Sequence, residues 1–399
     1  MALDPIPRGA ILALSLAAFG SGLSLRLGDP MLPMLAREFG VGLGTAANVV
    51  TMFSVAYGFA QLCFGPLGDR FGKYRVIALS SLACALTNLL CGLAQSFLQL
   101  ELARLTAGIS CAALIPLAMA WIGDVVPYEQ RQAALARYLI GQLMGLSAGV
   151  LVGGIAADQG QWRLPFLAIA AGFVLIGFTL LAIERRLPAQ ARQQQASGGH
   201  PLRRMFVEFG EVLARPRARI VLLAVFLEGG CVYGAFAFIV AHLHAHFGIA
   251  LTLAGSTLML FGFGGLLYAL ASVQLVRRLG EARLAASGGL VLALSYLAIA
   301  WAPDWRLALP ACLCAGLGFY MLHTTLQINA TQMAPERRGA AMSAFAACFF
   351  LGQASGVAFN AWMVSRSGSA RAIALDAAGA LLVALAFARK LREGSSAIH

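Results

Sequence analysis

Residues 65–75 read Gly-Pro-Leu-Gly-Asp-Arg-Phe-Gly-Lys-Tyr-Arg and lie between two long apolar runs. The charged side chains of this stretch, each of which would cost several kcal/mol inside hydrocarbon, are Asp69, Arg70, Lys73 and Arg75. Gly65 and Gly72 allow the ends of two helices to approach closely, because glycine accepts backbone conformations that other residues avoid. The stretch therefore predicts a tight, charged turn between two membrane helices.

The composition of the whole chain supports a membrane location. Hydrophobic residues make up 60% of the sequence, charged residues only 12%, and the mean hydropathy is +0.79. These values exclude an ordinary soluble domain. Since about 20 residues cross roughly 30 Å of hydrocarbon, a chain of 399 residues has room for about twelve crossings. We predict an all-α membrane protein with twelve transmembrane helices near 10–33, 44–64, 75–95, 98–121, 133–155, 164–183, 219–241, 252–275, 284–302, 307–329, 339–363 and 371–388.

The net charge of +12 is explained by membrane topology and does not require a nucleic-acid partner. Lysine and arginine fall overwhelmingly on one side of the predicted segments, the side that also carries both ends of the chain. An excess of these residues marks cytoplasmic loops, so we expect both termini in the cytoplasm. All eight cysteines lie inside apolar segments, which argues against a disulfide framework.

The chain divides into two related halves. Residues 184–218 are polar and predict a cytoplasmic linker, within which Met205–Leu213 has the pattern of a short amphipathic helix. Sliding the sequence by 207 residues places Gly145 on Gly352 and Gly149 on Gly356. We therefore predict six helices in residues 1–183 and six in residues 219–399, related as a parallel repeat.

The charged turn resembles the signature loop between the second and third helices of the major facilitator superfamily. This resemblance implies twelve helices in two six-helix halves, with a substrate site between the halves near the middle of the membrane. It also implies a conformational switch at Gly65, Asp69, Arg70 and Gly72. We expect Asp69 and Arg70 to stabilise the outward-open state by bonding across the cytoplasmic ends of the halves.

A second pattern narrows the resemblance to drug exporters of this superfamily. The fifth segment carries glycines four residues apart, which form a face that another helix can approach closely; they include Gly145, Gly149, Gly153 and Gly154. The pattern resembles the antiporter motif of the drug:proton exporters with twelve segments. The chain departs from that motif at Val150, where the family has proline, and ordinary packing of small residues is the alternative interpretation.

Ionisable groups inside the predicted segments are the candidates for coupling, because such groups are costly and usually face a cavity or a partner. Arg26 and Asp29 are spaced i, i+3 in the first segment and are expected to pair. Asp29 resembles the aspartate near the outer end of this segment in drug:proton antiporters, whereas a purely structural pair is the alternative. Arg104 in the fourth segment is a second cation, expected to engage a carboxylate or an anionic substrate.

Glu228 lies near the middle of the seventh segment, without a basic residue beside it in that segment. Hydrocarbon disfavours the charged carboxylate, so Glu228 is expected to bind and release a proton or to contact a cationic substrate. The further polar residues that we assign to the substrate cavity are Tyr57, Gln61, His323 and Gln327, each of which has helix packing as its alternative role.

Three histidines near the outer end of the seventh segment raise the question of a metal. His242 and His246 share a helical face, while His244 points elsewhere. Two imidazoles without a nearby thiolate or carboxylate make an incomplete site for most metals. We therefore expect no metal site and retain His242 and His246 only as weak candidates.

Together these features predict a secondary transporter that works by alternating access, a proton-coupled exporter of drugs or small metabolites. A transition-metal or metal-chelate exporter and a non-transporting receptor or scaffold remain alternatives. We expect no enzymatic activity and no cofactor. The expected partners are a small-molecule substrate, protons and membrane lipid, for a monomer in the inner membrane of a bacterium.

Overall fold

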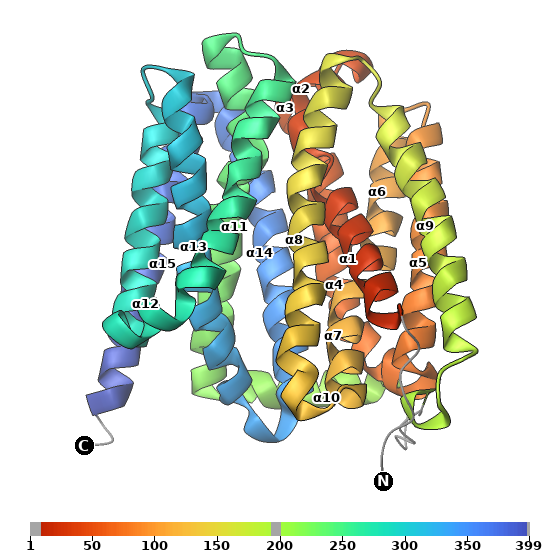
Figure 1. The fold of residues 1–399 in the computed structure, drawn as a ribbon. Coiled ribbons are helices and arrows are strands. Elements are labelled where there is room, and N and C mark those ends of the chain that lie inside the picture. Colours follow the sequence, from red (N-terminus) through yellow and green to blue (C-terminus); the bar gives the residue numbers. More distant parts are fainter. Residues whose placement is uncertain (1–8, 193–200, 397–399) are drawn as a thin grey trace.

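The computed structural model describes residues 9–192 and 201–396. Within these ranges the chain forms α-helices and short 3-10 turns, with no strand. The long helices run roughly parallel to one another, and the start of α1 and the end of α15 both lie toward the same end of the bundle (Figure 1). We call this end the termini side and the other end the far side. The predicted all-α membrane architecture is confirmed.

The helices lie where the apolar segments predicted them. Several predicted segments are divided between two helices, and several helices are longer than the segment predicted. The first part of the chain contains α1 (Ala10–Arg26), η1 (Asp29–Met31), α2 (Leu32–Phe39), α3 (Leu43–Ala46), α4 (Asn48–Phe71), α5 (Lys73–Leu93), α6 (Phe97–Cys111), α7 (Leu114–Val125), α8 (Tyr128–Asp158) and α9 (Arg163–Glu184). The rest contains η2 (Ala189–Arg192), α10 (Pro201–Ala214), α11 (Pro216–Phe247), α12 (Leu251–Ala300), η3 (Trp305–Leu307), α13 (Ala308–Met333), η4 (Pro335–Arg337), α14 (Arg338–Ser367) and α15 (Ser369–Ser396).

The number of membrane crossings depends on how α12 is divided. Among the described residues, eleven helical stretches are long and apolar enough to cross a membrane, and one of them is the 50-residue α12. This helix contains a non-helical residue, Gly280, with φ of 69°. The chain reverses at this glycine, so α12 comprises two crossings and the structure is consistent with twelve. The prediction of separate segments at 252–275 and 284–302 agrees with this division.

The charged turn is much shorter than the sequence predicted. Helix α4 continues through Pro66 to Phe71, and α5 begins at Lys73, so Gly72 alone joins them. Gly72 has φ of 87°, in the region that favours glycine. The last turns of this helix pack on α7, where a Cβ at Gly68 would lie 2.6 Å from the Leu117 side chain. The expectation of a turn over residues 65–75 was therefore wrong in extent.

Glycines bring pairs of helices into close contact at matching positions. In the first part, a Cβ added to Gly145 of α8 would overlap the carbonyl oxygen of Phe19 in α1. In the second part, a Cβ added to Gly352 of α14 would overlap the carbonyl oxygen of Phe226 in α11. Both the glycines and their partners are 207 residues apart, which is the interval that the sequence repeat predicted. Small residues at such crossings allow backbones to approach closely.

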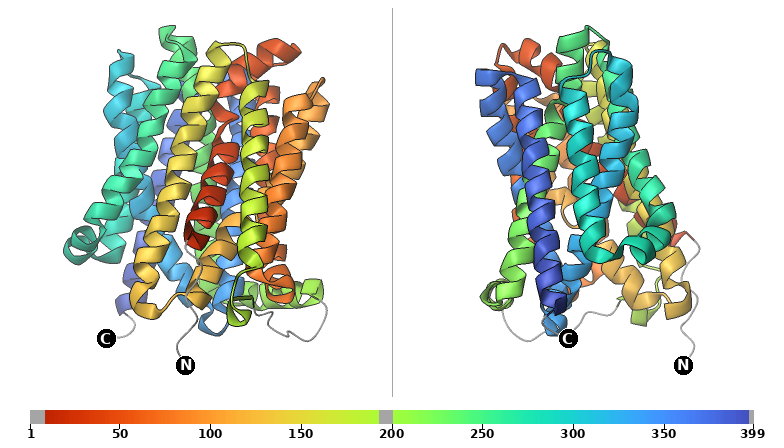
Figure 2. Two further views of the ribbon diagram at one scale, coloured as in Figure 1. Left: turned by 45° about the vertical axis from the view of Figure 1, so that its right-hand side comes forward. Right: turned by 90° about the vertical axis from the view of Figure 1, so that its left-hand side faces the viewer.

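Two helix pairs connect the first part of the bundle to the second. Helix α4 packs against α14, and α8 packs against α12. Helix α10 lies across the termini side, roughly perpendicular to the long helices (Figure 2), and contacts both α4 and α14. The amphipathic helix predicted at Met205–Leu213 falls within α10. Part of the predicted linker 184–218, residues 193–200, lies outside the described residues.

Candidate functional site

A large cavity of about 1660 Å³ lies between the two parts of the bundle. Its wall comes from α4, α7 and α8 on one side and from α12, α13 and α14 on the other. Residues at helix ends on the termini side, including Asp69, Arg277 and Arg337, also line it. The cavity therefore opens toward the termini side.

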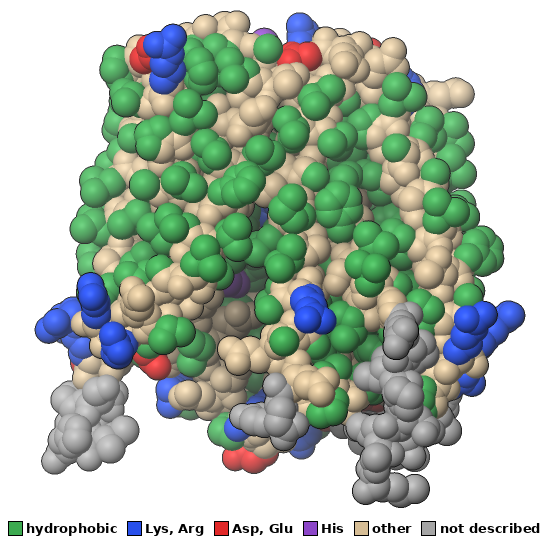
Figure 3. Space-filling view, in the orientation of Figure 1, with side chains coloured by type: hydrophobic (Ala, Val, Ile, Leu, Met, Phe, Trp, Pro, Cys, Tyr) green, Lys and Arg blue, Asp and Glu red, His purple; other side chains and the backbone are tan. Residues whose placement is uncertain are grey.

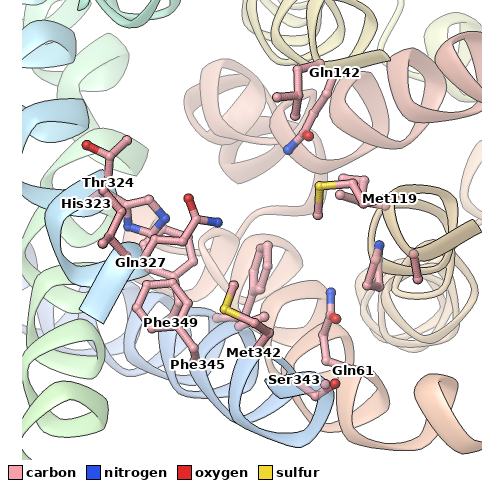
Figure 4. Close-up of a pocket in the computed structure, with 18 of the residues that line it drawn as sticks. Gln61, Met119, Gln142, His323, Thr324, Gln327, Met342, Ser343, Phe345 and Phe349 are labelled. Atoms are coloured by element: carbon pink, nitrogen blue, oxygen red, sulfur yellow. The ribbon is translucent and has the colours of Figure 1, made fainter. Parts of the chain in front are cut away.

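The side chains in the cavity combine aromatic rings, methionines and amides. Figure 4 shows His323, Gln327, Phe345 and Phe349 on one wall, facing Gln61, Met119 and Gln142 across an open space. These groups offer apolar contact area together with a few hydrogen-bonding positions, as expected of a site for organic molecules. Tyr57 also lines the wall, with its ring centroid 4.2 Å from that of Phe350.

Gln61 lines this cavity and has a buried amide oxygen without a hydrogen-bond partner among the described residues. This atom is Oε1, and Gln61 is only 3% exposed. A buried amide oxygen without a partner is costly. A donor on a bound molecule would satisfy it, which makes Gln61 a candidate contact for substrate.

Arg26 closes the inner end of the cavity. Its guanidinium donates to Oε1 of Gln353 at 3.1 Å and lies 3.5 Å from Oδ2 of Asp29. Gln353 of α14 in turn donates to the hydroxyl of Ser54 in α4 at 2.7 Å. The guanidinium carbon of Arg26 also lies over the Tyr233 ring, 3.8 Å from its centroid. These contacts join the two parts of the bundle beyond the cavity.

The predicted pair of Arg26 and Asp29 thus forms, but it belongs to a larger cluster. Asp29 is fully buried, and its Oδ1 atom has no hydrogen-bond partner among the described residues. Gln353 and Tyr233 were missed by the sequence analysis. A signal for Tyr233 was present, since it is the residue that the 207-residue shift aligns with Arg26.

A second contact between the two parts of the bundle lies on the far side. The carboxylate of Asp158 at the end of α8 accepts hydrogen bonds from the backbone of Leu251 at 2.9 Å and of Thr252 at 2.6 Å. The first backbone amides of a helix have no acceptor within the helix itself, and an acidic side chain at this end stabilises it. Asp158 therefore caps a helix in the other part of the bundle and ties the two parts together, a role that the sequence analysis did not predict.

Glu228 of α11 pairs with a histidine of another helix. Its Oε2 atom lies 2.9 Å from Nδ1 of His323 in α13, and the Glu228 side chain has no exposure. His323 lines the cavity, and its ring packs against Phe349 and Phe319 at centroid distances of 4.8 Å and 5.0 Å. Glu228 therefore lies behind the cavity wall, and His323 lies between it and the cavity.

Arg104 does not lie in the cavity. It is fully buried among α1, α4 and α6, where its guanidinium donates to the carbonyl oxygens of Val49 at 3.1 Å and Ser24 at 2.9 Å. It is absent from the residues that line the cavity. The expected contact with substrate is therefore not formed, because Arg104 points into the packing of the first helices.

The charged residues of the predicted switch pair with nearby helices. Lys73 binds Asp69 at 3.2 Å and Asp124 of α7 at 2.7 Å. Arg70 lies over the ring of its neighbour Phe71. Asp69 and Gly65 line the cavity, whereas Gly72 forms the turn. Among the described residues, this arrangement contains no bond from Asp69 or Arg70 across the halves; the expectation concerns the other, outward-open state.

The predicted antiporter-like helix is α8, and its glycines have different partners. Added Cβ atoms on Gly145 and Gly149 would meet carbonyl oxygens of α1, and one on Gly153 would meet the carbonyl oxygen of Leu27 directly after α1. A Cβ on Gly154 would lie 2.6 Å from the carbonyl oxygen of Leu251 in α12. One helix thus packs closely on both parts of the bundle.

The histidines on the far side have other partners than a metal. Both ring nitrogens of His242 are within hydrogen-bond distance of protein atoms, Ser369 Oγ at 2.9 Å and the Ile299 carbonyl oxygen at 3.2 Å. His246 stacks on His242 with ring centroids 5.6 Å apart. In the part of the chain that the structure describes, no group of three or more potential ligands is close enough to hold a metal ion.

The chain belongs to the Major Facilitator Superfamily, whose sequence model matches residues 14–357. It is similar to an uncharacterized MFS-type transporter, YceJ, of Bacillus subtilis (strain 168), with 24% identity over 352 residues and 86% of each chain covered. It is also similar to the multidrug export protein EmrB of Escherichia coli (strain K12), with 28% identity over 176 residues. That match covers 44% of this chain and 34% of EmrB.

Solved structures show the same fold. The nucleoside transporter NupG aligns with a TM-score of 0.73 and 14% identity, covering 95% of this chain and 98% of its own. A bacterial homolog of the human lysosomal transporter Spinster, in an inward-facing and unoccupied conformation, aligns with a TM-score of 0.72 and 20% identity, covering 97% and 96%. The protein is a multi-pass membrane transporter of small molecules and not an enzyme.

Proposed function

We propose that this transporter is a proton-coupled exporter of drugs or small metabolites, in which Glu228 and His323 exchange the coupling proton. The observation that carries this proposal is the 2.9 Å contact between a fully buried carboxylate and a cavity-lining imidazole. Proton uptake by Glu228 removes its attraction for a charged imidazole and releases His323 into the cavity. Groups of this kind inside a membrane commonly mark proton pathways.

The nature of the cavity supports organic substrates. Its wall presents aromatic rings and methionines with a few amides, which suit molecules of mixed polarity. The name of EmrB, a multidrug export protein, supports export, although its match covers only part of both chains. We assign Gln61, Tyr57 and Gln327 to substrate contact and exclude Arg104 from it.

Alternating access would follow from movement of two bodies, residues 1–183 and 219–399, joined by the linker 184–218. The cluster of Arg26, Gln353 and Ser54 would hold them together beyond the cavity in the present state, and bonds from Asp69 and Arg70 would do so on the termini side in the other state. We place both termini in the cytoplasm of a bacterium, which makes the present cavity inward-open, and we propose a monomer as the working unit.

The test is a screen for coupled proton movement. The purified protein is placed in liposomes containing a pH-sensitive dye, a pH gradient is imposed, and a panel of organic cations, anions and neutral compounds is added. We expect at least one compound to release protons down the gradient only when the protein is present. Transport that is indifferent to the gradient for every transported compound would contradict proton coupling.

A further inference from the structure

The cavity also has an opening on the side of the bundle. In the space-filling view the surface between α8 and α12 is hollowed, and a histidine side chain is visible inside the hollow (Figure 3). His323 is the histidine that lines the cavity. Because this view looks across the helices, the hollow faces the region that lipid would occupy.

Helix packing explains why the opening occurs here. Toward the far side, α8 and α12 touch closely: a Cβ on Gly255 would lie 2.9 Å from the Val150 carbonyl oxygen, and one on Gly262 would overlap the Ser147 hydroxyl. Toward the termini side, residues of both helices line the cavity, and the hollow of Figure 3 lies between them. The rim residues that both line the cavity and are exposed are Leu139 of α8 and Ala269, Val273, Val276 and Arg277 of α12.

On the other side of the cavity, the corresponding pair of helices, α4 and α14, is in close contact. A Cβ on Gly58 of α4 would lie 3.1 Å from the side chain of Leu351 and 3.2 Å from the carbonyl oxygen of Ala347, both in α14. Cavity-lining residues along this contact, including Leu62 and Ser343, are only partly exposed. Helix α10 contacts the same two helices on the termini side. On this flank, within the described residues, α4 and α14 therefore stay in contact where they line the cavity.

We propose that the gap between α8 and α12 is a portal through which an amphipathic organic molecule enters the cavity from the adjoining lipid leaflet. Four of the five rim residues are apolar, so an apolar chain or ring can pass between them without entering a polar environment, while the fifth, Arg277, lies at the termini-side end of the rim. Hydrogen-bonding groups follow immediately inside, at Gln142 of α8 and at Thr324 and Gln327 of α13. This order fits a molecule whose apolar part occupies the gap and whose polar end reaches the amides. The proposal rests on the proposed transport of organic compounds.

The first test measures the portal without measuring transport. A bimane fluorophore is attached to a cysteine at Gln142, which lies just inside the gap, or at Ser343, which lies on the closed wall, after replacement of the native cysteines. Vesicles contain phosphatidylcholine with a nitroxide on its acyl chain, and iodide serves as the aqueous quencher. We expect iodide to quench both sites, while the lipid nitroxide quenches the Gln142 site more strongly. Equal lipid quenching at both sites would overturn the proposal.

The second test measures entry. Ala269→Trp fills the rim, and Leu270→Trp is the matched control, because Leu270 is 79% exposed and does not line the cavity. Transport of a short-chain and a long-chain ester of the same rhodamine dye is compared. We expect Ala269→Trp to lose the long-chain ester and keep the short-chain one, and Leu270→Trp to keep both. Equal loss of both esters in Ala269→Trp would contradict entry through the portal. If the unaltered protein moves neither ester, the proposed substrate class fails, and the quenching experiment still decides whether the portal exists.

Discussion

The guanidinium carbon of Arg26 lies 3.8 Å from the centroid of the Tyr233 ring, and these two residues are 207 positions apart, equivalent in the internal repeat. The cation of the first half thus lies over the aromatic ring at the equivalent position of the second half. A cation held over an aromatic ring in a desolvated site is stabilised by up to about 2 kcal/mol. Because Arg26 contacts residues of the second half, a movement of the two halves relative to each other would change its surroundings.

Gln353→Leu should open the far side. Gln353 accepts from Arg26 at 3.1 Å and donates to Ser54 at 2.7 Å, so it links α14 to both α1 and α4. Loss of a hydrogen bond from a charged group costs about 1.5–3 kcal/mol, which would change the ratio of the two states roughly tenfold to a hundredfold. Spin labels at the exposed residues Gln161 and Arg306 on the far side would measure the change as a longer inter-label distance.

A matched control is Gln142→Leu, the same substitution at a cavity residue that does not join the halves through this cluster. We expect its label distances to match those of the unaltered protein. An unchanged distance distribution in Gln353→Leu would show that the Arg26 cluster does not hold the far side closed.

Asp29→Asn should uncouple transport from the proton gradient. The carboxylate is fully buried beside Arg26 and keeps one oxygen without a hydrogen-bond partner among the described residues, so a proton there changes the charge that Arg26 experiences. Asparagine preserves the shape and removes the titration. We expect gradient-driven accumulation in vesicles to be lost while downhill exchange continues. Full accumulation in this variant would make the pair purely structural.

Asp69→Asn should shift the protein toward the present, termini-open state and lower its turnover, with little effect on substrate affinity. Asp69 lines the cavity mouth and is available to bond across the halves when the mouth closes. Asp124→Asn is the control, because Asp124 shares Lys73 with Asp69 but does not line the cavity. Cysteine accessibility on the termini side measures the shift. Identical behaviour of the two variants would limit Asp69 to positioning Lys73.

Gly145→Ala should destabilise the fold, because its Cβ would overlap the carbonyl oxygen of Phe19 in the neighbouring helix. Overpacking of this kind costs about 1–3 kcal/mol. Gly172→Ala in α9 is the control, since a Cβ there meets nothing within 4 Å. We expect thermal unfolding in detergent to occur at a lower temperature for Gly145→Ala only. Equal unfolding temperatures for the two variants would mean that α1 and α8 can separate without cost.

The backbone arrangement was largely accessible from the sequence. Apolar length predicts where helices cross, and glycine spacing predicts the close contact at Gly145, because both depend on residues near one another in the chain. The extent of the turn at Gly72 was not accessible. The last turns of α4 pack through Gly68 on Leu117, and such a contact between distant segments is not visible in the local sequence.

The side-chain partners were less accessible, since they depend on which helix faces which. Glu228 and His323 were each identified as candidates, yet nothing in the sequence joins residues 95 positions apart. Arg104 was assigned to the cavity because it is a cation in an apolar segment, and only the packing of α1, α4 and α6 shows that it points away. The internal repeat could have pointed to one of these partners, because a shift of 207 residues aligns Arg26 with Tyr233, the residue whose ring it contacts.

The most direct test of the account is proton movement in Glu228→Gln. In liposomes that contain the unaltered protein and a pH-sensitive dye, addition of a transported compound should move protons in the opposite direction to the compound. Glutamine keeps a hydrogen-bonding group near His323 but cannot exchange the proton. We expect this variant to bind cationic substrates more weakly, because the negative charge behind His323 at the cavity wall is lost. It should carry compounds only downhill and move no protons. Substrate-driven proton flux at the unaltered rate in Glu228→Gln would contradict the account.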